Sequence, residues 1–335
     1  MHHGLSLRQQ NEEVLKVFMA GTSLEHAYGG PAYTVSRLAA ALAAEGVTVG
    51  LWAPDKSAPR SSIIGDNTTI VRLSGKAHNV LVTFGRPDVI HDNGLWWRHN
   101  HQLARIARRL GVPRVVSPRG MLEPWAIQHK GLKKKIAWTL YQGRDLRTAA
   151  LHHATMEPEA RNILRMDLGV PVTTIPNGVD MPEIHLLRTP VRADRGRDDI
   201  RTALFMGRIY PVKGLPLLIE AWARVRPAGW RLVIAGPDEG GHLVVVKRAA
   251  IAAGIADVVS FPGAVSGAQK QEMFADADLF VLPTQSESFG VVVAEALSFG
   301  LPVLTTVGAP WPQLQESDSG WRVDVSVEGV EQGLR

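Results

Sequence analysis

Two glutamates near the C-terminus have the spacing and the surroundings of a ligand site. Glu287 follows the apolar run 279–282 and a Pro-Thr turn, and Glu295 comes eight positions later in another apolar segment. This pattern predicts a buried strand, then a loop that holds Glu287, then a helix that begins at Phe289–Gly290 and carries Glu295 about two turns in. Free N–H groups at that helix N-terminus would face an anion at the edge of a sheet. Carboxylates on both sides of it suit a nucleotide sugar.

The segment Glu287-Ser288-Phe289-Gly290, with Glu295 behind it, resembles the signature of the retaining glycosyltransferases of family four. The resemblance implies the GT-B fold, in which two Rossmann-like, doubly wound α/β domains face each other across a cleft. It also implies that Glu287, Ser288, Phe289, Gly290 and Glu295 bind the donor, with Glu287 at the sugar and Glu295 at the ribose hydroxyls. The alternative for Glu295 is an ordinary exposed position of a helix.

A basic loop follows the apolar run 203–206 and carries Arg208 and Lys213. The planar guanidinium of arginine matches phosphate oxygens, and lysine supplies a mobile point charge. Together they could neutralise a departing diphosphate without a metal ion. In the family that the chain resembles, such a Gly-Arg…Lys-Gly element binds the donor diphosphate. The alternative for either residue alone is an exposed surface cation.

The N-terminal half offers Gly29 and Gly30, which follow a first apolar run and open a helical pattern. Glycine lets the backbone approach a phosphate closely, although a Gly-Gly pair before proline is also an ordinary turn. The pair does not match the Gly-x-Gly-x-x-Gly pattern of nicotinamide enzymes. Its place in the first loop resembles the glycine loop of the family, which lies at the β-phosphate of the donor.

Polar residues follow the next strands of this half. His91 lies at the carboxyl end of a predicted strand, and Asn93 occupies the position where many relatives have a second histidine. The resemblance implies that His91 lies near the donor sugar, while a histidine bonded to the backbone is the alternative. Asn93 and Arg119 are candidates for acceptor binding, and Arg119 could instead pair with Glu123.

Short apolar runs alternate with helical patterns along the chain, which predicts parallel, doubly wound sheets. At 335 residues the chain is long enough for two domains. We expect an N-terminal acceptor domain at 1–181, a linker rich in Arg, Asp and Pro at 182–201, and a donor domain at 202–335. The chain ends soon after the run 302–305, so the donor domain is expected to be short at its C-terminus.

Composition limits the partners and the location. The chain has no cysteine, and its hydrophobic content is 45%, so disulfides and thiolate metal sites are excluded. No apolar run approaches the roughly 18 residues of a membrane span, and the first residues lack the apolar stretch of a signal peptide. These features predict a cytoplasmic protein, or one peripheral on the inner face of the cytoplasmic membrane.

A net charge of +5 would admit a nucleic-acid partner, but the aromatic residues are not interleaved with Arg and Lys as stacking platforms require. An anionic substrate or an anionic membrane surface explains the excess instead. Asp276 and Asp278 have the Asp-x-Asp form of a metal site. They precede the strand 279–282 instead of following it, so we expect no metal ion and no other cofactor.

The segment 132–150 predicts a helix with two unlike sides. One side, at the spacing of a core-facing side, consists of Leu132, Ile136, Leu140 and Gly143. The opposite side gathers Lys134, Trp138 and Tyr141. With Lys133, Lys135, Arg144 and Arg147 nearby, the basic and aromatic side is typical of a helix that lies on an anionic membrane. The alternative is a solvated basic face on a core helix.

Together with the resemblance, these features imply retaining, metal-independent transfer of a hexosyl group from a nucleoside diphosphate sugar. The acceptor would be a saccharide or a lipid-linked molecule, in surface polysaccharide biosynthesis. The catalytic candidates are His91, Arg208, Lys213 and Glu287. One alternative is a non-catalytic or truncated scaffold that binds nucleotide sugars. Another is an epimerase of similar fold, which would release the nucleoside diphosphate without an acceptor.

Overall fold

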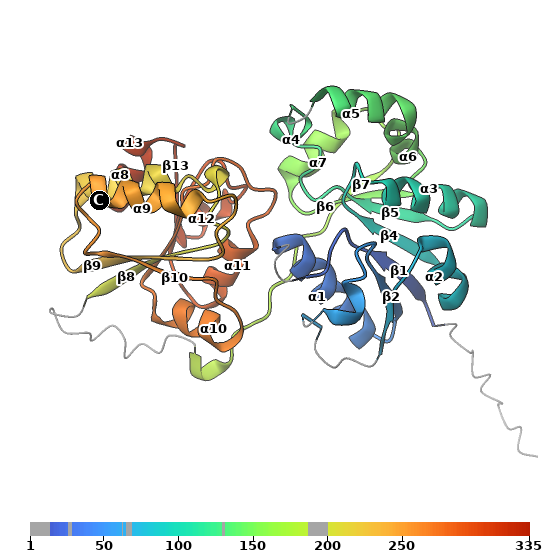
Figure 1. Cartoon of the computed structure of the whole chain (residues 1–335), viewed down its shortest axis with the longest axis horizontal. Coiled ribbons are helices and arrows are strands. Elements are labelled where there is room, and N and C mark those ends of the chain that lie inside the picture. Colours follow the sequence, from blue (N-terminus) through green and yellow to red (C-terminus); the bar gives the residue numbers. More distant parts are fainter. Residues whose placement is uncertain (1–13, 26–28, 62, 65–68, 129–130, 187–199) are drawn as a thin grey trace, which may run out of the picture. The chain divides into compact units, whose positions relative to one another are not determined.

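The chain folds into two compact units, one of residues 1–153 and 163–173, the other of residues 154–162 and 174–335 (Figure 1). The computed structural model describes residues 14–25, 29–61, 63–64, 69–128, 131–186 and 200–335. Most of the linker predicted at 182–201, namely residues 187–199, lies outside these ranges.

The first sheet has seven strands in the order β3-β2-β1-β4-β5-β6-β7, and its pairs from β1 to β6 are parallel. The strands are β1 (Lys16–Ala20), β2 (Thr48–Trp52), β3 (Ile70–Leu73), β4 (Val89–Asn93), β5 (Arg114–Ser117), β6 (Leu151–Ala154) and β7 (Val172–Thr174). The helices along this part of the chain are α1 (Gly30–Ala44), α2 (Ala77–Phe84), α3 (Arg98–Leu110), α4 (Pro124–Gln128), α5 (Gly131–Ala137), α6 (Gly143–Arg147) and α7 (Glu157–Leu164), with a short 3-10 turn, η2 (Ala58–Arg60).

Alternate residues of β1 serve separate cores on the two faces of this sheet. Phe18 packs with α2 and α3 in one buried cluster, while Met19 packs with α1 in another. Successive side chains of a strand point to opposite faces, and a strand buried on both faces reads as a continuous apolar run. This burial explains why residues 17–20 of the strand are all apolar.

The second sheet has six strands in the order β10-β9-β8-β11-β12-β13, all in parallel pairs. Its strands are β8 (Arg201–Met206), β9 (Trp230–Ala235), β10 (Val259–Gly263), β11 (Leu279–Leu282), β12 (Val303–Thr306) and β13 (Gly320–Val323). Its helices are α8 (Leu215–Val225), α9 (His242–Ala252), α10 (Gly267–Asp276), α11 (Val291–Ser298), α12 (Gln313–Glu316) and α13 (Val327–Leu334), with 3-10 turns at η4 (Ile184–Leu186) and η6 (Pro211–Lys213). The two doubly wound parallel sheets confirm the predicted fold class.

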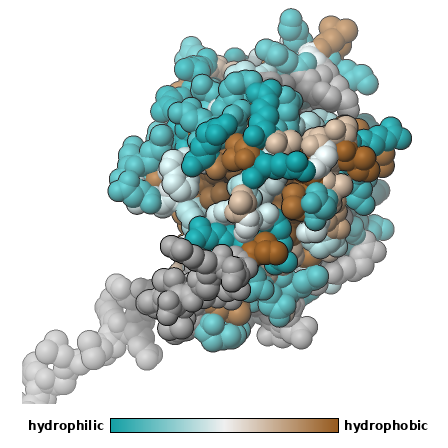
Figure 2. Space-filling view, turned by 90° about the vertical axis from the view of Figure 1, so that its left-hand side faces the viewer, coloured by the Kyte–Doolittle hydropathy of each residue, from teal (hydrophilic) through white to brown (hydrophobic). Residues whose placement is uncertain are grey.

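On the face that Figure 2 shows, hydrophilic residues cover most of the surface, and hydrophobic ones occur in small separate groups. Such scattered apolar residues are normal for a folded domain. Among the described residues, none of the helices is long and apolar enough to cross a bilayer.

In the helix predicted at 132–150, the side that faces the core is the opposite of the one expected. It runs from α5 through the π-helix η3 (Trp138–Gln142) into α6, but Leu132 and Leu140 are 76% and 74% exposed. The inward side is the basic and aromatic one. Lys134 donates to the carbonyl of Ala126 and lies 5.4 Å from the ring centroid of Trp96. The prediction that the aliphatic side packs on the core was therefore wrong.

Buried charge joins the neighbouring strands β4 and β5 of the first unit. Asp92 is fully buried and accepts from Arg114 at 2.8 Å and from Asn100 at 2.7 Å. Arg114 also donates to the backbone carbonyl of Asp145. Burial raises the pKa of Asp92 to about 6, against the opposing charge of Arg114. A buried carboxylate without such partners would be far more costly.

Three buried histidines of the first unit give its stability a dependence on pH. Burial lowers the pKa of His91 to about 3 and the pKa of His99 and of His152 to about 4. The unfolded chain therefore binds more protons than the folded one between about pH 6.5 and 4, and stability falls as pH falls through this range. Asp92 acts in the opposite sense between about pH 6 and 4, but it is one group against three.

We expect His99→Phe to make the unfolding free energy less sensitive to acid. His99 packs edge-on against Trp52 with ring centroids 5.9 Å apart, and its buried Nε2 has no hydrogen-bond partner in the described part of the chain. Phenylalanine keeps the ring contact and removes one proton site. Urea unfolding between about pH 7 and 4 measures the effect. His78→Gln, at an exposed position of α2, is the control, and an equal acid response in His99→Phe and wild type would contradict the assignment.

Candidate functional site

The strand order of the second sheet reverses between β8 and β11, which are neighbours. The loop after β8 carries Arg208 and Lys213, and the loop after β11 carries Glu287. Crevices at the carboxyl ends of strands on either side of such a reversal are where open α/β sheets bind ligands. The topology thus brings together residues that lie more than seventy positions apart in the sequence.

Lys213 and Glu287 form an ion pair in which the ammonium group donates to Oε1. Each side chain is only 13% exposed. The two loops are also joined through their backbones, because Gln285 donates to the carbonyl of Val212 at 2.8 Å. Gly214 has φ +67°, and a Cβ there would overlap the carbonyl oxygen of Pro283, so glycine is required for this close approach.

Arg208 pairs with Glu239, a residue that the sequence analysis did not select. The guanidinium Nη1 lies 2.5 Å from Oε2, and both side chains are more than 40% exposed. Their loops are joined by backbone bonds, in which Ile209 donates to Pro237 at 2.8 Å and Glu239 donates to Ile209 at 3.1 Å. The Gly-Pro-Asp-Glu-Gly-Gly turn after β9 was the signal that could have identified Glu239.

Glu295 is buried in α11, with 8% of its surface exposed, which excludes the alternative of an ordinary exposed helix position. Lys270 of α10 lies 2.5 Å from its Oε1. The other carboxylate oxygen, Oε2, is buried and has no hydrogen-bond partner among the described residues. Lys270 was also missed by the sequence analysis, because nothing in the spacing of α10 and α11 shows that the two helices meet there.

The residues between the two glutamates serve the loop and the helix start. Gly290 precedes α11 with φ +78° and is its N-cap. Phe289 is buried against Trp311 with ring centroids 5.3 Å apart, and its carbonyl accepts from the indole N–H at 2.5 Å. The Phe289 side chain therefore supports the loop, while Ser288 is half-buried beside it. Donor contacts for Ser288, Phe289 and Gly290 remain predictions.

In the first sheet the strand order reverses between β1 and β4. Gly29 follows β1 as the N-cap of α1, with φ +80°, and Gly30 is exposed at the first position of this helix. A Cβ at Gly30 would meet no described atom within 4 Å, so packing does not require glycine at this position. The predicted phosphate role of the pair fits this place, and residues 26–28 of the same loop lie outside the described ranges.

His91 lies at the carboxyl end of β4 in a buried hydrogen-bonded chain. Its Nε2 is 2.8 Å from the hydroxyl of Ser117, which is 2.8 Å from Nδ1 of His153. The pKa of His91 is lowered by burial first, and then by the charges of Arg119 and His153. His91 is consequently uncharged at neutral pH. The alternative was a histidine that bonds to the backbone, but the partner of Nε2 is a serine hydroxyl. The catalytic role of His91 stays a prediction.

Asn93 and Arg119 contact each other, and their role in acceptor binding stays a prediction. The Nε and Nη2 groups of Arg119 donate to Oδ1 of Asn93 at 3.1 and 2.9 Å. Both residues line a small hollow together with Pro31 of α1 and residues of the loop after β1. Arg119 has φ +54°, an unusual value for a non-glycine residue and one that is often retained at functional positions.

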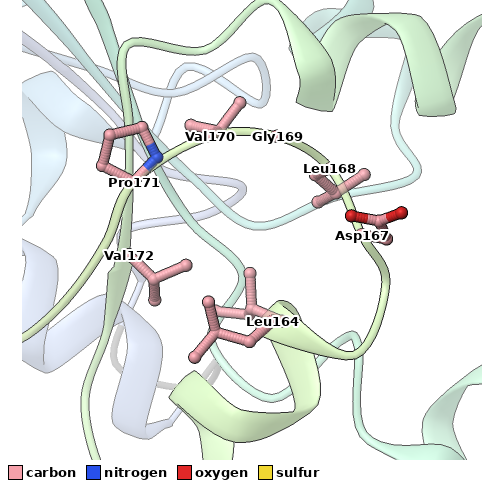
Figure 3. Close-up of a pocket in the computed structure, with 8 residues that line it drawn as sticks. Leu164, Asp167, Leu168, Gly169, Val170, Pro171 and Val172 are labelled. Atoms are coloured by element: carbon pink, nitrogen blue, oxygen red, sulfur yellow. The ribbon is translucent and has the colours of Figure 1, made fainter.

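Two other features do not contribute to this site. Asp278 accepts from the backbone N–H of Thr202 at 2.8 Å, at the amino end of β11, as expected for residues that precede the strand. A pocket of about 370 Å³ in the first unit is lined by one stretch between α7 and β7, from Ile163 to Val172 (Figure 3). None of the predicted donor or acceptor residues lines it.

Two family descriptions match the chain. Residues 29–178 match a glycosyl transferase 4-like domain, and residues 190–326 match the glycosyl transferases group 1. The second match contains Arg208, Lys213, Glu287 and Glu295. The first contains Gly29, His91, Asn93 and Arg119.

Curated relatives include two proteins named D-inositol 3-phosphate glycosyltransferase. The one from Segniliparus rotundus is 34% identical over 160 residues, which cover 46% of this chain and 36% of the relative. The one from Streptomyces scabiei is 29% identical over 256 residues, which cover 71% of this chain and 57% of the relative. The chain thus matches less than two thirds of the length of each.

Solved structures with the same fold include sucrose-phosphate synthase from Thermosynechococcus elongatus and HepE from Anabaena in complex with UDP and glucose. The first has a TM-score of 0.76 at 16% identity, and the alignment covers 96% of this chain and 88% of the synthase chain. The second has a TM-score of 0.72 at 18% identity, and the alignment covers 95% of this chain and 88% of the HepE chain. The glycosyltransferase WaaG of lipopolysaccharide biosynthesis aligns with a TM-score of 0.59 at 17% identity, over 95% and 89%.

Proposed function

The chain belongs to the group 1 glycosyl transferases of GT-B fold, and from this premise we propose that it transfers a hexosyl group from a nucleoside diphosphate sugar. The acceptor in this proposal is a saccharide or a lipid-linked molecule of surface polysaccharide biosynthesis, and the anomeric configuration is retained. The observation that carries the proposal is the Lys213–Glu287 pair at the reversal point of the second sheet.

The pair supports a donor site because its charges match the two parts of a nucleotide sugar. Lys213 and Arg208, which lie in the same loop, would bind the diphosphate. Glu287 would accept hydrogen bonds from hydroxyls of the sugar. Both cations already have carboxylate partners, so the diphosphate would replace a partner instead of meeting a bare charge. Preorganised cations of this kind stabilise a leaving group electrostatically, and the proposal therefore includes no metal ion.

The proposed step proceeds on one face of the sugar. The bond between the anomeric carbon and the diphosphate oxygen breaks, and the acceptor oxygen bonds to the same carbon from the same side. The departing phosphate oxygen takes the proton of the acceptor hydroxyl, so atoms and charge balance. No pair of carboxylates flanking the scissile bond is needed, in contrast to a glycosidase.

In the first unit, we assign His91 to the donor sugar and the Asn93–Arg119 pair to the acceptor. The uncharged His91 would act through a hydrogen bond and not as a cation. An acceptor that carries phosphate is a second candidate, favoured by the guanidinium of Arg119 in the hollow beside α1. The relatives named D-inositol 3-phosphate glycosyltransferase agree with that candidate.

A non-catalytic scaffold that only binds nucleotide sugars is the principal alternative. The epimerase alternative, with release of nucleoside diphosphate and no transfer, is distinguished in the same assay. Purified protein is incubated with nucleoside diphosphate sugars, with and without saccharide acceptors, and the released nucleotide and the transferred sugar are both measured. Binding without release supports a scaffold, release without transfer supports the epimerase, and transfer with retention supports the proposal.

We expect Arg208→Ala to lower kcat/KM by about 10²-fold, since a preorganised group at a leaving charge contributes about that much. Thermal unfolding should change little, because an exposed ion pair adds little stability. Arg201→Ala, at the amino end of the same strand β8, is the matched control and should retain full activity. Turnover of Arg208→Ala within a few-fold of wild type would exclude the proposed role.

The two glutamates should differ in what they bind. Glu295→Ala is expected to weaken binding of the free nucleoside diphosphate and of the intact donor by a similar factor, about 10-fold or more. The reason is that both ligands contain the ribose. Glu287→Ala should weaken binding of the intact donor. It should leave binding of the free nucleoside diphosphate unchanged, because Lys213 is then released from its carboxylate partner. Calorimetric titration of both ligands tests this. Equal losses for both ligands in both variants would refute the division.

The outward side of the segment 131–147 supports a proposal that the protein is peripheral on an anionic membrane. Leu132, Ile136 and Leu140 are 76%, 54% and 74% exposed, and the neighbouring Lys133 and Lys135 are exposed as well. The acidic residue of the segment, Asp145, is buried. Apolar side chains flanked by cations fit the interface of an anionic bilayer. The lipid contact is therefore aliphatic, and not the Trp and Tyr side inferred from the sequence.

Replacement of Leu132, Ile136 and Leu140 by serine should abolish sedimentation with phosphatidylglycerol vesicles, since each buried leucine contributes about 2 kcal/mol. Lys133→Gln with Lys135→Gln should weaken binding by about 30-fold at low salt, at about 1 kcal/mol per cation. Val82→Ser, at a 72% exposed position of α2, is the control. Wild type that ignores anionic vesicles at low salt would overturn the membrane proposal and leave the donor site unaffected.

A further inference from the structure

Lys270 is held in place by contacts on two sides. Its ammonium group lies 2.5 Å from Oε1 of Glu295 and 5.9 Å from the ring centroid of Phe274, one turn further along α10. Phe274 is buried and contacts Phe280 and Phe299, with ring centroids 5.8 and 5.4 Å away. The lysine stem therefore follows a fixed aromatic surface, and its charge is directed at α11.

Glu295 is left with one satisfied and one unsatisfied oxygen. Oε1 accepts from Lys270, while Oε2 is buried and lacks a partner among the residues that the structure describes. A carboxylate that is paired with an ammonium group can only accept hydrogen bonds. A buried acceptor without a donor is unfavourable. The missing partner must therefore be a hydrogen-bond donor, and a hydroxyl group of a ligand meets this requirement.

We propose that Lys270 is a positioning residue, which holds Glu295 so that Oε2 accepts from a ribose hydroxyl of the donor. The inference rests on the proposed function, and it adds a specificity. The site should prefer a ribonucleotide to its 2′-deoxy analogue, and Lys270 should be needed for that preference. The family resemblance assigns no role to Lys270, whose part follows from the contact with Glu295 and from the orphaned oxygen.

The test compares the binding of ribose and deoxyribose ligands. The dissociation constants of UDP, ADP and GDP, and of their 2′-deoxy forms, are measured calorimetrically on the intact protein. Wild type should bind the preferred ribonucleotide about 10-fold more tightly than its deoxy form, as for one hydrogen bond to a charged group. Lys270→Met keeps an unbranched apolar stem along Phe274 and should reduce this ratio to near one. Lys270→Arg keeps the charge and should restore much of the ratio.

The control for folding is the thermal unfolding temperature of each variant, and affinity for inorganic pyrophosphate should be equal in wild type and Lys270→Met. A full ribose preference in Lys270→Met overturns the inference and leaves the proposed function intact. Equal binding of ribose and deoxyribose ligands by wild type also overturns it. If none of the three nucleoside diphosphates binds wild type, the proposed function fails together with the inference.

Discussion

The ion pair between Lys213 and Glu287 determines the electrostatics of the candidate donor site. With each side chain only 13% exposed, either charge alone would lose much of its hydration, at a cost of several kcal/mol. Each residue therefore requires the other while the site is empty. Under the proposed function, a diphosphate would take over the lysine while the sugar hydroxyls would take over the glutamate.

The backbone around this pair is constrained by the same need for close approach. The loops after β8 and β11 meet because the two strands are neighbours at the reversal of the sheet, and Gly214 allows the first loop to lie against the carbonyl of Pro283. A side chain at that position would separate the loops and with them Lys213 from Glu287. The strand order and Gly214 together therefore keep the charges of Lys213 and Glu287 close to each other.

Most of the fold could be predicted from sequence, because strands buried on both faces read as apolar runs and helices as periodic ones. The loop positions of Arg208, Lys213 and Glu287 followed from the same patterns. Glu239 and Lys270 did not, since their importance lies in contacts with residues 31 and 25 positions away. Periodicity also assigned the wrong side of the segment 131–147 to the core. Local pattern cannot show that Trp96 provides a partner for Lys134.

The two units provide different electrostatic environments for ligands. At the reversal point of the second sheet the polar groups are paired ions, which suits a diphosphate. At the end of β4, by contrast, His91, Ser117 and His153 form a chain in which the serine hydroxyl has only one proton to donate. At least one imidazole must therefore donate to Ser117 or leave a bond unmade, so the two rings have linked tautomers. Burial keeps His91 uncharged, and an uncharged imidazole that is hydrogen-bonded in such a chain suits the hydroxyls of a sugar.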